Sequence, residues 1–188
     1  MYKQPGSSRE HFCKPTDIAV ASDGSFFVSD GYCNSRILKF SPQGQLLYQW
    51  GAFGREPGQF RIPHSLKLDE RTMRLYVADR ENGRVEIFDP NDGSFKEAWS
   101  STVRRAFALD FPTPTQGSED YLFIVDGPSL GGRPKPVKVY VLDMNLHGNV
   151  VEQFGNLEQP HDLVVTHQGR EVFVAEITLD TVLKYVKV

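Results

Sequence analysis

The strongest constraint on the fold is a pattern that the chain repeats four times. Each copy is a short run of β-branched and aromatic residues that ends on an acidic side chain. The runs cover residues 25–30, 74–79, 121–126 and 171–176. Their last residues, 30, 79, 126 and 176, are 49, 47 and 50 positions apart. Regular spacing of this length indicates an architecture that uses one structural unit several times.

Each run has matching neighbours that also have the composition of strands. Upstream strands are expected at 17–20, 65–68, 106–109 and 162–165, and downstream strands at 36–40, 84–88, 138–142 and 181–185. A fourth strand is expected in three copies, at 45–50, 94–99 and 149–154. Four short antiparallel strands per repeat are typical of the blades of a β-propeller, whose sheets stack on one another. We predict one all-β domain over residues 1–188, with blades at about 14–51, 62–100, 105–155 and 159–188.

Composition narrows the function classes. The chain has 188 residues, 39% hydrophobic and 24% charged, which is ordinary for a soluble globular domain. The net charge of −3 gives no electrostatic footprint for nucleic acid, so we expect no nucleic-acid partner. The apolar runs are too short to span a bilayer, so no membrane insertion is expected. The first six residues, Met1 to Gly6, lack the apolar stretch of a signal peptide.

Hairpin geometry places the candidate site on one rim of the blades. The start of the first strand and the end of the second meet at the same end of a hairpin, so His64 should lie beside Arg80. His64 and His161 each follow a proline at the same repeat position. Two imidazoles in equivalent positions form a plausible zinc site, although Pro-His is also open to interpretation as a packing feature of the repeat. No third histidine is found, and Arg105 stands roughly where the third copy would place one.

Three further residues on this rim are candidates. Asp162 could bind a hard cation such as calcium, or it could cap a strand turn. Arg80 suits a substrate carboxylate, or it could form a structural pair with Asp79 or Glu81. Tyr32 could act as a general base if a nearby cation lowered its pKa, and is otherwise an ordinary rim tyrosine.

The two cysteines, Cys13 and Cys33, fall on the same rim. A disulfide between them would close a loop of about 20 residues and contribute roughly 3 kcal/mol. A bridge would also indicate a secretory compartment, whereas the start of the chain argues against one. Two separate reduced thiols are the alternative.

Several strings resemble the lyase domain of peptidylglycine α-amidating enzymes. The resemblance runs from about Gln4 to the end and is weakest between residues 101 and 157. Its looser part is shared with NHL-repeat propellers in general. The most specific strings are Asp30-Gly31-Tyr32-Cys33-Asn34-Ser35-Arg36 and Ala78-Asp79-Arg80-Glu81-Asn82-Gly83-Arg84, with shorter matches at Pro57-Gly58-Gln59-Phe60, Pro63-His64-Ser65-Leu66 and Pro160-His161-Asp162.

The resemblance implies an activity and a set of cofactors. It implies a six-bladed propeller of NHL-type four-stranded blades that splits a peptidyl-α-hydroxyglycine into a peptide amide and glyoxylate. A catalytic zinc on three histidines and a structural calcium are implied as well. By resemblance, His64 and His161 match two of the zinc ligands, and Asp162 matches the calcium-binding carboxylate.

The resemblance also assigns the remaining candidates. Tyr32 matches the proposed base that takes the proton of the substrate hydroxyl, and Arg80 matches an active-site arginine. Cys13 and Cys33 match a disulfide of the family. The implied partners are a peptide substrate ending in α-hydroxyglycine and, in a full-length protein, a monooxygenase domain.

The chain departs from the family pattern in ways that lower the expected activity. The family's first two blades have no counterpart here, and with them the third zinc histidine is missing. Gln159 stands where a methionine is expected, and Tyr76 and Ile87 replace the cysteines of a second disulfide. We therefore expect that Met1 begins a truncated chain, an arc of about four blades, whose full-length parent is secreted or lies in the lumen of the secretory pathway.

The function expected from the sequence is that of a zinc-dependent lyase in C-terminal peptide amidation. The chain would carry about two thirds of the site, bind zinc weakly and turn over slowly or not at all. The alternative is a non-catalytic NHL-repeat propeller that binds a protein or peptide on its rim. That alternative predicts no metal.

Overall fold

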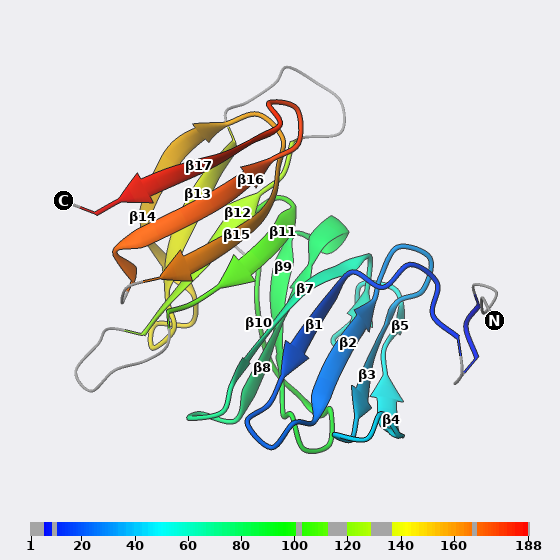
Figure 1. Cartoon of the computed structure of the whole chain (residues 1–188). Helices are drawn as coiled ribbons and strands as arrows, with labels where there is room; N and C mark the ends of the chain where they lie inside the picture. The colour runs from blue at the N-terminus through cyan, green and yellow to red at the C-terminus, as the bar shows by residue number, and fades with distance from the viewer. Residues whose placement is uncertain are drawn as a thin grey trace. The chain divides into compact units, whose positions relative to one another are not determined.

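The structure, a computed structural model, describes residues 6–8, 11–100, 103–112, 120–128, 137–166 and 169–187. The chain divides into two compact units, Met1–Ala98 and Trp99–Val188, which we describe one at a time. Both units are built of short strands in twisted sheets (Figure 1). Within the described part of the chain, no helix is long and apolar enough to cross a bilayer.

The first unit contains two four-stranded sheets in which each strand pairs with the next along the chain. The first sheet consists of β1 (Asp17–Val20), β2 (Phe26–Asp30), β3 (Arg36–Phe40) and β4 (Leu46–Trp50). The second consists of β7 (Pro63–Asp69), β8 (Arg74–Asp79), β9 (Arg84–Phe88) and β10 (Phe95–Trp99). The short strands β5 (Ala52–Phe53) and β6 (Gln59–Phe60) come between these two sheets in the sequence and pair with each other. The 3-10 turn η1 (Arg80–Asn82) follows β8.

The second unit repeats this plan with one strand fewer. Its four-stranded sheet consists of β11 (Ala106–Asp110), β12 (Tyr121–Asp126), β13 (Val137–Asp143) and β14 (Asn149–Leu157). Its three-stranded sheet consists of β15 (Pro160–Thr166), β16 (Glu171–Glu176) and β17 (Thr181–Val186). The predicted all-β chain of repeated four-stranded blades is therefore confirmed, and the fourth blade contributes three strands as expected.

In the first unit, the two sheets pack face to face, and apolar side chains from alternate positions of their strands meet between them. One face of β1 to β3 meets the opposite face of β7 to β9. The buried cluster between them consists of Ala19, Phe27, Ile37, Phe60, Leu66, Leu75, Val77 and Phe88. Gly31 permits the close approach of the two sheets at the rim, since a Cβ there would collide with the carbonyl oxygen of Pro63.

The second unit packs its two sheets in the same way. Side chains from the inner strands of the first sheet meet those of β15 and β16. The cluster consists of Phe107, Ala108, Phe123, Val125, Val137, Val139, Val141, Leu157, Leu163, Val165, Val172 and Val174. Each unit is thus a pair of stacked blades with its own apolar core.

The acidic residue that ends the second strand of each blade anchors the chain as it enters that blade. Its carboxylate accepts a backbone N–H from the segment just before the first strand. The donors and acceptors are Cys13 N to Asp30 Oδ1 (2.8 Å), Arg61 N to Asp79 Oδ1 (2.7 Å), Arg105 N to Asp126 Oδ1 (2.8 Å) and Gln159 N to Glu176 Oε2 (2.8 Å). The repeated acidic residue therefore has a structural role in all four blades.

The first two blades extend this anchor with an asparagine and an arginine. The contacts are Asn34 Nδ2 to Asp30 Oδ2 (2.6 Å) with Arg36 Nε to Asp30 Oδ2 (3.1 Å), and Asn82 Nδ2 to Asp79 Oδ2 (2.6 Å) with Arg84 Nε to Asp79 Oδ2 (2.9 Å). The guanidinium groups also bind backbone carbonyls of the entering segments, those of Ser7, Ser8 and His11 for Arg36 and those of Arg55, Glu56 and Gln59 for Arg84. Much of the two most specific strings is therefore explained by folding.

Candidate active site

A β-bulge sets the direction of the histidine in the second blade. In the pairing of β7 with β8, Pro63 lies opposite Asp79 and Ser65 opposite Ala78, so His64 is an extra residue on its strand. Bulges redirect side chains and are common next to active sites. The imidazole that results is 5% exposed.

The same bulge recurs in the second unit and corrects one prediction. Ala106 lies opposite Asp126 and Ala108 opposite Val125, which makes Phe107 the repeat equivalent of His64. The sequence pattern places Arg105 roughly at that position. It is wrong by two residues because the first two strands of the third blade are joined by a longer connection, so that Phe107 precedes Asp126 by 19 residues whereas His64 precedes Asp79 by 15.

Tyr32 meets His64 between the two blades of the first unit. It lies in the loop between β2 and β3, and its hydroxyl is 3.0 Å from His64 Nε2. The two rings are edge to face, with centroids 5.5 Å apart. Tyr32 is 42% exposed, so part of the residue is open to solvent.

Arg80 completes this cluster from the 3-10 turn after β8. Its guanidinium carbon lies 5.4 Å from the centre of the Tyr32 ring, within range of a cation–π interaction. Its Nε donates to Glu81 Oε1 at 2.9 Å. The structural pairing considered for Arg80 is therefore present with Glu81, whereas Asp79 pairs with Arg84. From the sequence, Glu81 is expected only as a structural partner of Arg80.

A disulfide fixes the loop that carries Tyr32. Cys13 and Cys33 are bonded, which confirms the predicted pair. The bridge ties the segment before β1 to the residue next to Tyr32. It closes a separation of 20 residues in sequence and thereby limits how far the tyrosine loop can move.

Two buried carboxyl groups lie behind the cluster. Burial raises the pKa of Asp79, against the opposing effect of hydrogen bonds from Arg61, Asn82 and Arg84. Burial also raises the pKa of Glu86 to about 7, although Arg84 pairs with it at 2.9 Å. These groups hold the segment before β7 in place, because Glu86 also accepts the backbone N–H of Gly58.

His161 and Asp162 lie in the second unit and have their own surroundings there. His161 is the extra residue in the pairing of β15 with β16, as His64 is in β7. Its ring packs edge to face on Phe107, with centroids 5.9 Å apart. Asp162 is exposed, and its Oδ1 accepts the backbone N–H of Leu163 at 2.8 Å.

The described residues fit a zinc or calcium site only in part. Among them, no group of three or more His, Cys, Asp and Glu side chains is placed to hold a metal ion. The first unit contributes one imidazole, His64, with a phenol already at its Nε2. Asp162 offers a single exposed carboxylate, whereas calcium takes six to eight oxygen ligands.

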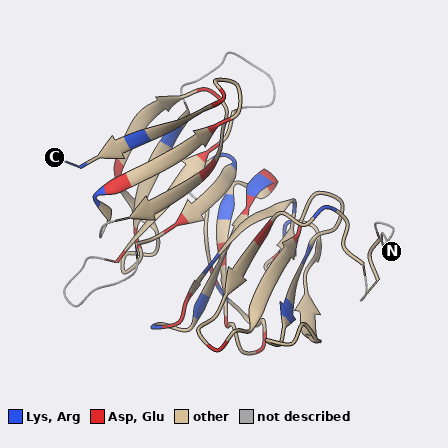
Figure 2. Ribbon diagram, in the orientation of Figure 1, with Lys and Arg blue, Asp and Glu red and all other residues tan. Residues whose placement is uncertain are grey.

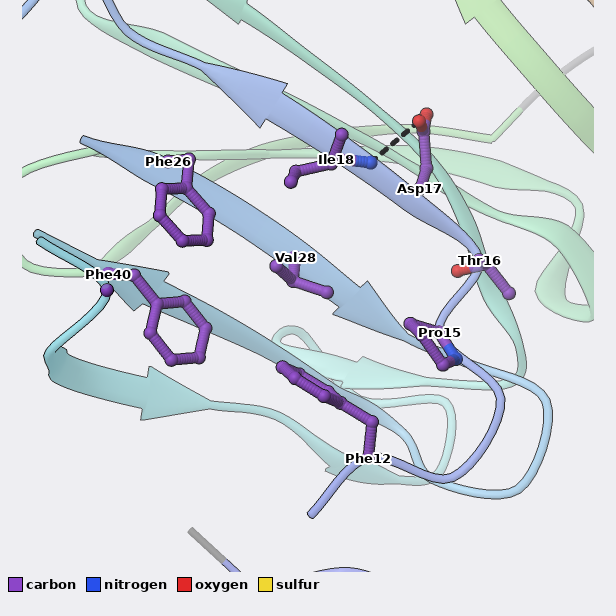
Figure 3. A pocket seen from close by; sticks show the side chains of 9 residues that line it. Phe12, Pro15, Thr16, Asp17, Ile18, Phe26, Val28 and Phe40 are labelled. Atoms are coloured by element: carbon purple, nitrogen blue, oxygen red, sulfur yellow. Dashed lines mark hydrogen bonds between the residues drawn. The ribbon is translucent and has the colours of Figure 1, made fainter. Parts of the chain in front are cut away.

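A separate apolar pocket of about 630 Å³ lies on the outward face of the first sheet. Figure 3 shows the side chains of Phe12, Ile18, Phe26, Val28 and Phe40 along it. The equivalent face of the second sheet is covered by the first sheet. The pocket therefore resembles a sheet face that packs against another sheet. We assign no catalytic or binding role to it.

Charges of both signs are interspersed over the strands and loops of each unit (Figure 2). Because charges of both signs are mixed, we describe the candidate site of the first unit by the groups that lie close to it. It combines a phenol, that of Tyr32, with an imidazole and a guanidinium that each lie against it. Such a set can accept a proton, bind a metal through one nitrogen and hold a carboxylate.

The fold and the repeat define the class of protein. Residues 12–40 match the family described as NHL repeat. With its stacked four-stranded sheets, the chain carries blades of an NHL-type β-propeller.

The most informative relatives are amidating enzymes. The chain is 39% identical over 193 residues to mouse peptidyl-glycine alpha-amidating monooxygenase, which covers 97% of the chain and 19% of that protein. It is 40% identical over 202 residues to the Drosophila melanogaster peptidyl-alpha-hydroxyglycine alpha-amidating lyase 1, which covers 97% and 36%. It is also 30% identical to human NHL repeat-containing protein 3, over 93% of the chain and 50% of that protein.

The chain spans about a fifth to a half of the length of these curated relatives. Solved structures show likeness of fold alone. The hydrazine synthase of Kuenenia stuttgartiensis superimposes with a TM-score of 0.67 at 17% identity, over 86% of the chain and 43% of its own. A structure of U3-55K gives a TM-score of 0.63 at 17% identity, over 92% and 51%.

Proposed function

We propose that the chain contributes the site of a lyase that cleaves peptidyl-α-hydroxyglycine into a peptide amide and glyoxylate. The observation that carries the proposal is the cluster of Tyr32, His64 and Arg80 in the first unit. The similarity to named amidating lyases and monooxygenases along 97% of the chain supports the same chemistry.

The reaction requires removal of one proton and breakage of one bond. The substrate carries a hydroxyl and a carboxylate on the carbon bonded to the amide nitrogen. Tyr32, as the phenolate, removes the hydroxyl proton. The C–O bond becomes a carbonyl while the C–N bond breaks, and the amide nitrogen takes up a proton to leave the peptide amide. The other product is glyoxylate.

Arg80 is assigned to the substrate carboxylate. Its side chain lies against the Tyr32 ring, so a carboxylate bound there brings the neighbouring hydroxyl close to the phenol. The hydrogen bond from Nε to Glu81 Oε1 orients the guanidinium on the rim.

Metal binding is part of the proposal. His64 and His161 are assigned to zinc, and Asp162 to calcium. A bound zinc would favour the alkoxide form of the substrate hydroxyl, as it does for bound water. Because the described residues supply this site only in part, we expect weak zinc binding and slow turnover by the chain alone.

We also propose a larger context. The substrate is a peptide ending in α-hydroxyglycine, which a monooxygenase domain in the same or another protein would produce. The disulfide supports function in the secretory pathway or outside the cell, because such bonds persist in oxidising compartments.

The test combines elemental analysis with an assay for glyoxylate. Purified chain is loaded with zinc and calcium, freed of excess metal and mixed with a peptide ending in α-hydroxyglycine. Bound zinc and zinc-dependent release of glyoxylate, even at a low rate, would support the proposal. Absence of zinc and calcium at every loading, together with absence of glyoxylate above the background rate, would refute it. Fast zinc-dependent turnover would instead show that the site is more complete than proposed.

A second candidate is a non-catalytic propeller that binds a protein or peptide on its rim. The similarity to NHL repeat-containing protein 3 favours it. The pairing of Arg80 with Glu81 is compatible with it as well, because a structural arginine would have such a partner. Under this function, neither His64→Ala nor His161→Ala would alter ligand binding, and metal would have no effect.

A further inference from the structure

Thr16 of the first blade is the repeat equivalent of His64 in the second. Each follows a proline, and each comes directly before the residue of the first strand that lies opposite the next-to-last residue of the second strand. Figure 3 shows Thr16 just ahead of β1. His64 meets Tyr32, whereas the Thr16 hydroxyl lies 2.6 Å from the carbonyl oxygen of Pro63 in the next blade. Thr16 therefore contacts the peptide unit from which the backbone of His64 continues.

The hydroxyl of Thr16 has several neighbours but a single proton. The carbonyl oxygen of Pro63 lies at 2.6 Å, the hydroxyl oxygen of Ser29 at 2.7 Å and the carbonyl oxygen of Ser29 at 3.2 Å. A carbonyl oxygen can only accept, and the shorter of the two carbonyl contacts is the one to Pro63. The proton is therefore assigned to Pro63. Gly31 presses on the same oxygen, since a Cβ there would collide with it. The Pro63 peptide unit is thus held from the neighbouring blade.

The backbone just before Pro63 is strained. Ile62 has a φ of 62°, in the left-handed region, where a β-branched residue is an outlier. Such a conformation persists only where the surrounding structure holds it. The carbonyl oxygen of Ile62 accepts the backbone N–H of Arg80 at 3.1 Å, and the next carbonyl oxygen, that of Pro63, accepts from Thr16. Two successive peptide units therefore fix the start of β7, one within its own blade and one from the blade before.

The second unit shows a different residue at this position. Phe107 of the third blade stands where Thr16 stands in the first. Its ring packs edge to face on His161, as the Tyr32 ring packs on His64. In the second unit, the contact with the histidine is therefore made from the first-strand position itself. In the first unit, that position carries a small hydroxyl residue, and the loop after β2 supplies the ring.

We propose that Thr16 is a positioning residue of the candidate active site. Its hydroxyl fixes the Pro63 peptide unit, and thereby the direction of the His64 imidazole and its contact with Tyr32. The effect on geometry follows from these contacts alone, whereas the effect on rate rests on the proposed lyase function. Thr16 acts through His64 and is assigned no contact with the substrate.

The test compares Thr16→Val, which removes the hydroxyl and keeps the shape, with Thr16→Ser, which keeps the hydroxyl. Each whole chain is labelled with ¹³C and ¹⁵N and studied by NMR without metal at one fixed pH. In wild type, nuclear Overhauser cross-peaks should join the rings of Tyr32 and His64, whose centroids are 5.5 Å apart. We expect Thr16→Val to lose these peaks and Thr16→Ser to keep them. Retention of the peaks in Thr16→Val, or equal loss in Thr16→Ser, would overturn the proposal.

Thr72→Val is the matched control. Thr72 Oγ1 donates to Asp69 Oδ2, also at 2.6 Å, in the turn between β7 and β8. This turn is at the end of the hairpin away from His64. The control should keep the cross-peaks, which separates a loss of positioning from a general loss of stability. Equal loss of the peaks in Thr72→Val and Thr16→Val would show that Thr16 has no special role.

Wild type provides a measurement that holds even if Thr16→Val does not fold. A hydroxyl proton bound to the Pro63 carbonyl should exchange slowly enough with water to give its own signal, with a cross-peak to the backbone N–H of His64. A Thr16 hydroxyl proton that exchanges too fast to be seen would count against the proposed hydrogen bond.

Kinetics test the consequence for the proposed reaction. With zinc and a peptide ending in α-hydroxyglycine, Thr16→Val should lower kcat by roughly 10- to 100-fold, because a misplacement of about 1 Å can cost that much. KM should hold, since the turn that carries Arg80 is bound to the carbonyl of Ile62 and not to that of Pro63. An unchanged kcat would refute the effect on rate. Absence of glyoxylate from every chain, wild type included, would count against the lyase function, and the NMR result would still decide the role of Thr16.

Discussion

The hydroxyl of Tyr32 lies 3.0 Å from Nε2 of His64, although 32 positions separate the two residues. Tyr32 follows the second strand of one blade, and His64 lies in the first strand of the next. Their contact therefore depends on the stacking of the two sheets. Any change that alters this stacking is expected to alter the site as well.

Replacing Tyr32 with phenylalanine tests its role as the base. If the proposed lyase function holds, Tyr32→Phe should lower the rate of glyoxylate release by roughly 100-fold or more, as expected for a lost general base. The free energy of unfolding should change by no more than about 1 kcal/mol, because one partly exposed hydrogen bond is lost. Release is measured from a peptide ending in α-hydroxyglycine with zinc present.

Tyr48→Phe is the matched control for that variant. Tyr48 donates to the carbonyl of Pro90 at 2.7 Å and takes no part in the cluster. The rate should be retained, even though stability falls by about 1 kcal/mol. Equal loss of rate in both variants would remove Tyr32 from the proposed mechanism.

Gly31→Ala should destabilise the first unit. The added Cβ would collide with the carbonyl oxygen of Pro63, and backbone atoms on both sides must shift to admit it. We expect a loss of about 2 to 3 kcal/mol in the free energy of unfolding, measured with urea. Gly54→Ala is the comparison, because the atoms nearest to its Cβ belong to the side chain of Gln59, whose amide end can turn aside. A loss for Gly31→Ala no larger than that for Gly54→Ala would contradict the close packing described.

Reduction of the disulfide should lower stability by roughly 3 kcal/mol, since the bridge closes a separation of 20 residues. In a thermal melt this corresponds to a fall of ~10 °C or more. The double variant Cys13→Ala/Cys33→Ala should melt at the same temperature with and without reductant. A wild-type melt that is insensitive to reductant, with the thiols shown to be free, would be the contrary result.

The stability of the chain should depend on pH through Glu86. Its pKa is about 7 in the folded state, above its ordinary value of 4.5, so the folded state holds this proton more tightly than the unfolded state. The stabilising contribution is present below pH 4.5 and is lost as the pH rises through 7. Glu86→Gln should therefore gain stability relative to wild type between pH 4 and pH 8, by on the order of 3 kcal/mol.

The measurement for this prediction is urea unfolding at several pH values. Glu152→Gln, at a side chain that is half exposed, is the control and should run parallel to wild type. Parallel profiles for Glu86→Gln and wild type would show that the buried carboxyl does not take up a proton on folding.

The repeated blades were predictable because short runs of β-branched and aromatic residues recur at a regular spacing between clear turns. Hairpin geometry predicts that Tyr32, His64 and Arg80 lie on one rim, since the start of the first strand and the end of the second meet at the same end of a blade. It also places Cys13 and Cys33 on that rim, which favours the disulfide that the structure contains. These features depend on the order of the strands along the chain, and the repeated sequence pattern indicates that order.

Other features depend on a register that sequence does not show. In the third blade, a longer connection between the first two strands hides the register, and Phe107 stands two residues after Arg105 as the repeat equivalent of His64. The hydrogen bond of Arg80 with Glu81 was one of two pairings that adjacency allowed, and the 3-10 turn selected it. The asparagine and arginine on Asp30 and Asp79 belong to recognisable strings, but only the structure shows that they bind the entering chain.

The carboxylate that anchors each blade accepts a main-chain N–H, and every residue except proline has one. The side chain at the donor position is therefore free to vary without loss of the fold. Cys13 uses it for a disulfide, Arg61 stacks on Phe53, and Arg105 donates to the carbonyl of Pro128. In an architecture of this kind, the side chain at the donor position of one blade can change without disturbing the sheet. New functional groups can therefore be added to the rim one blade at a time.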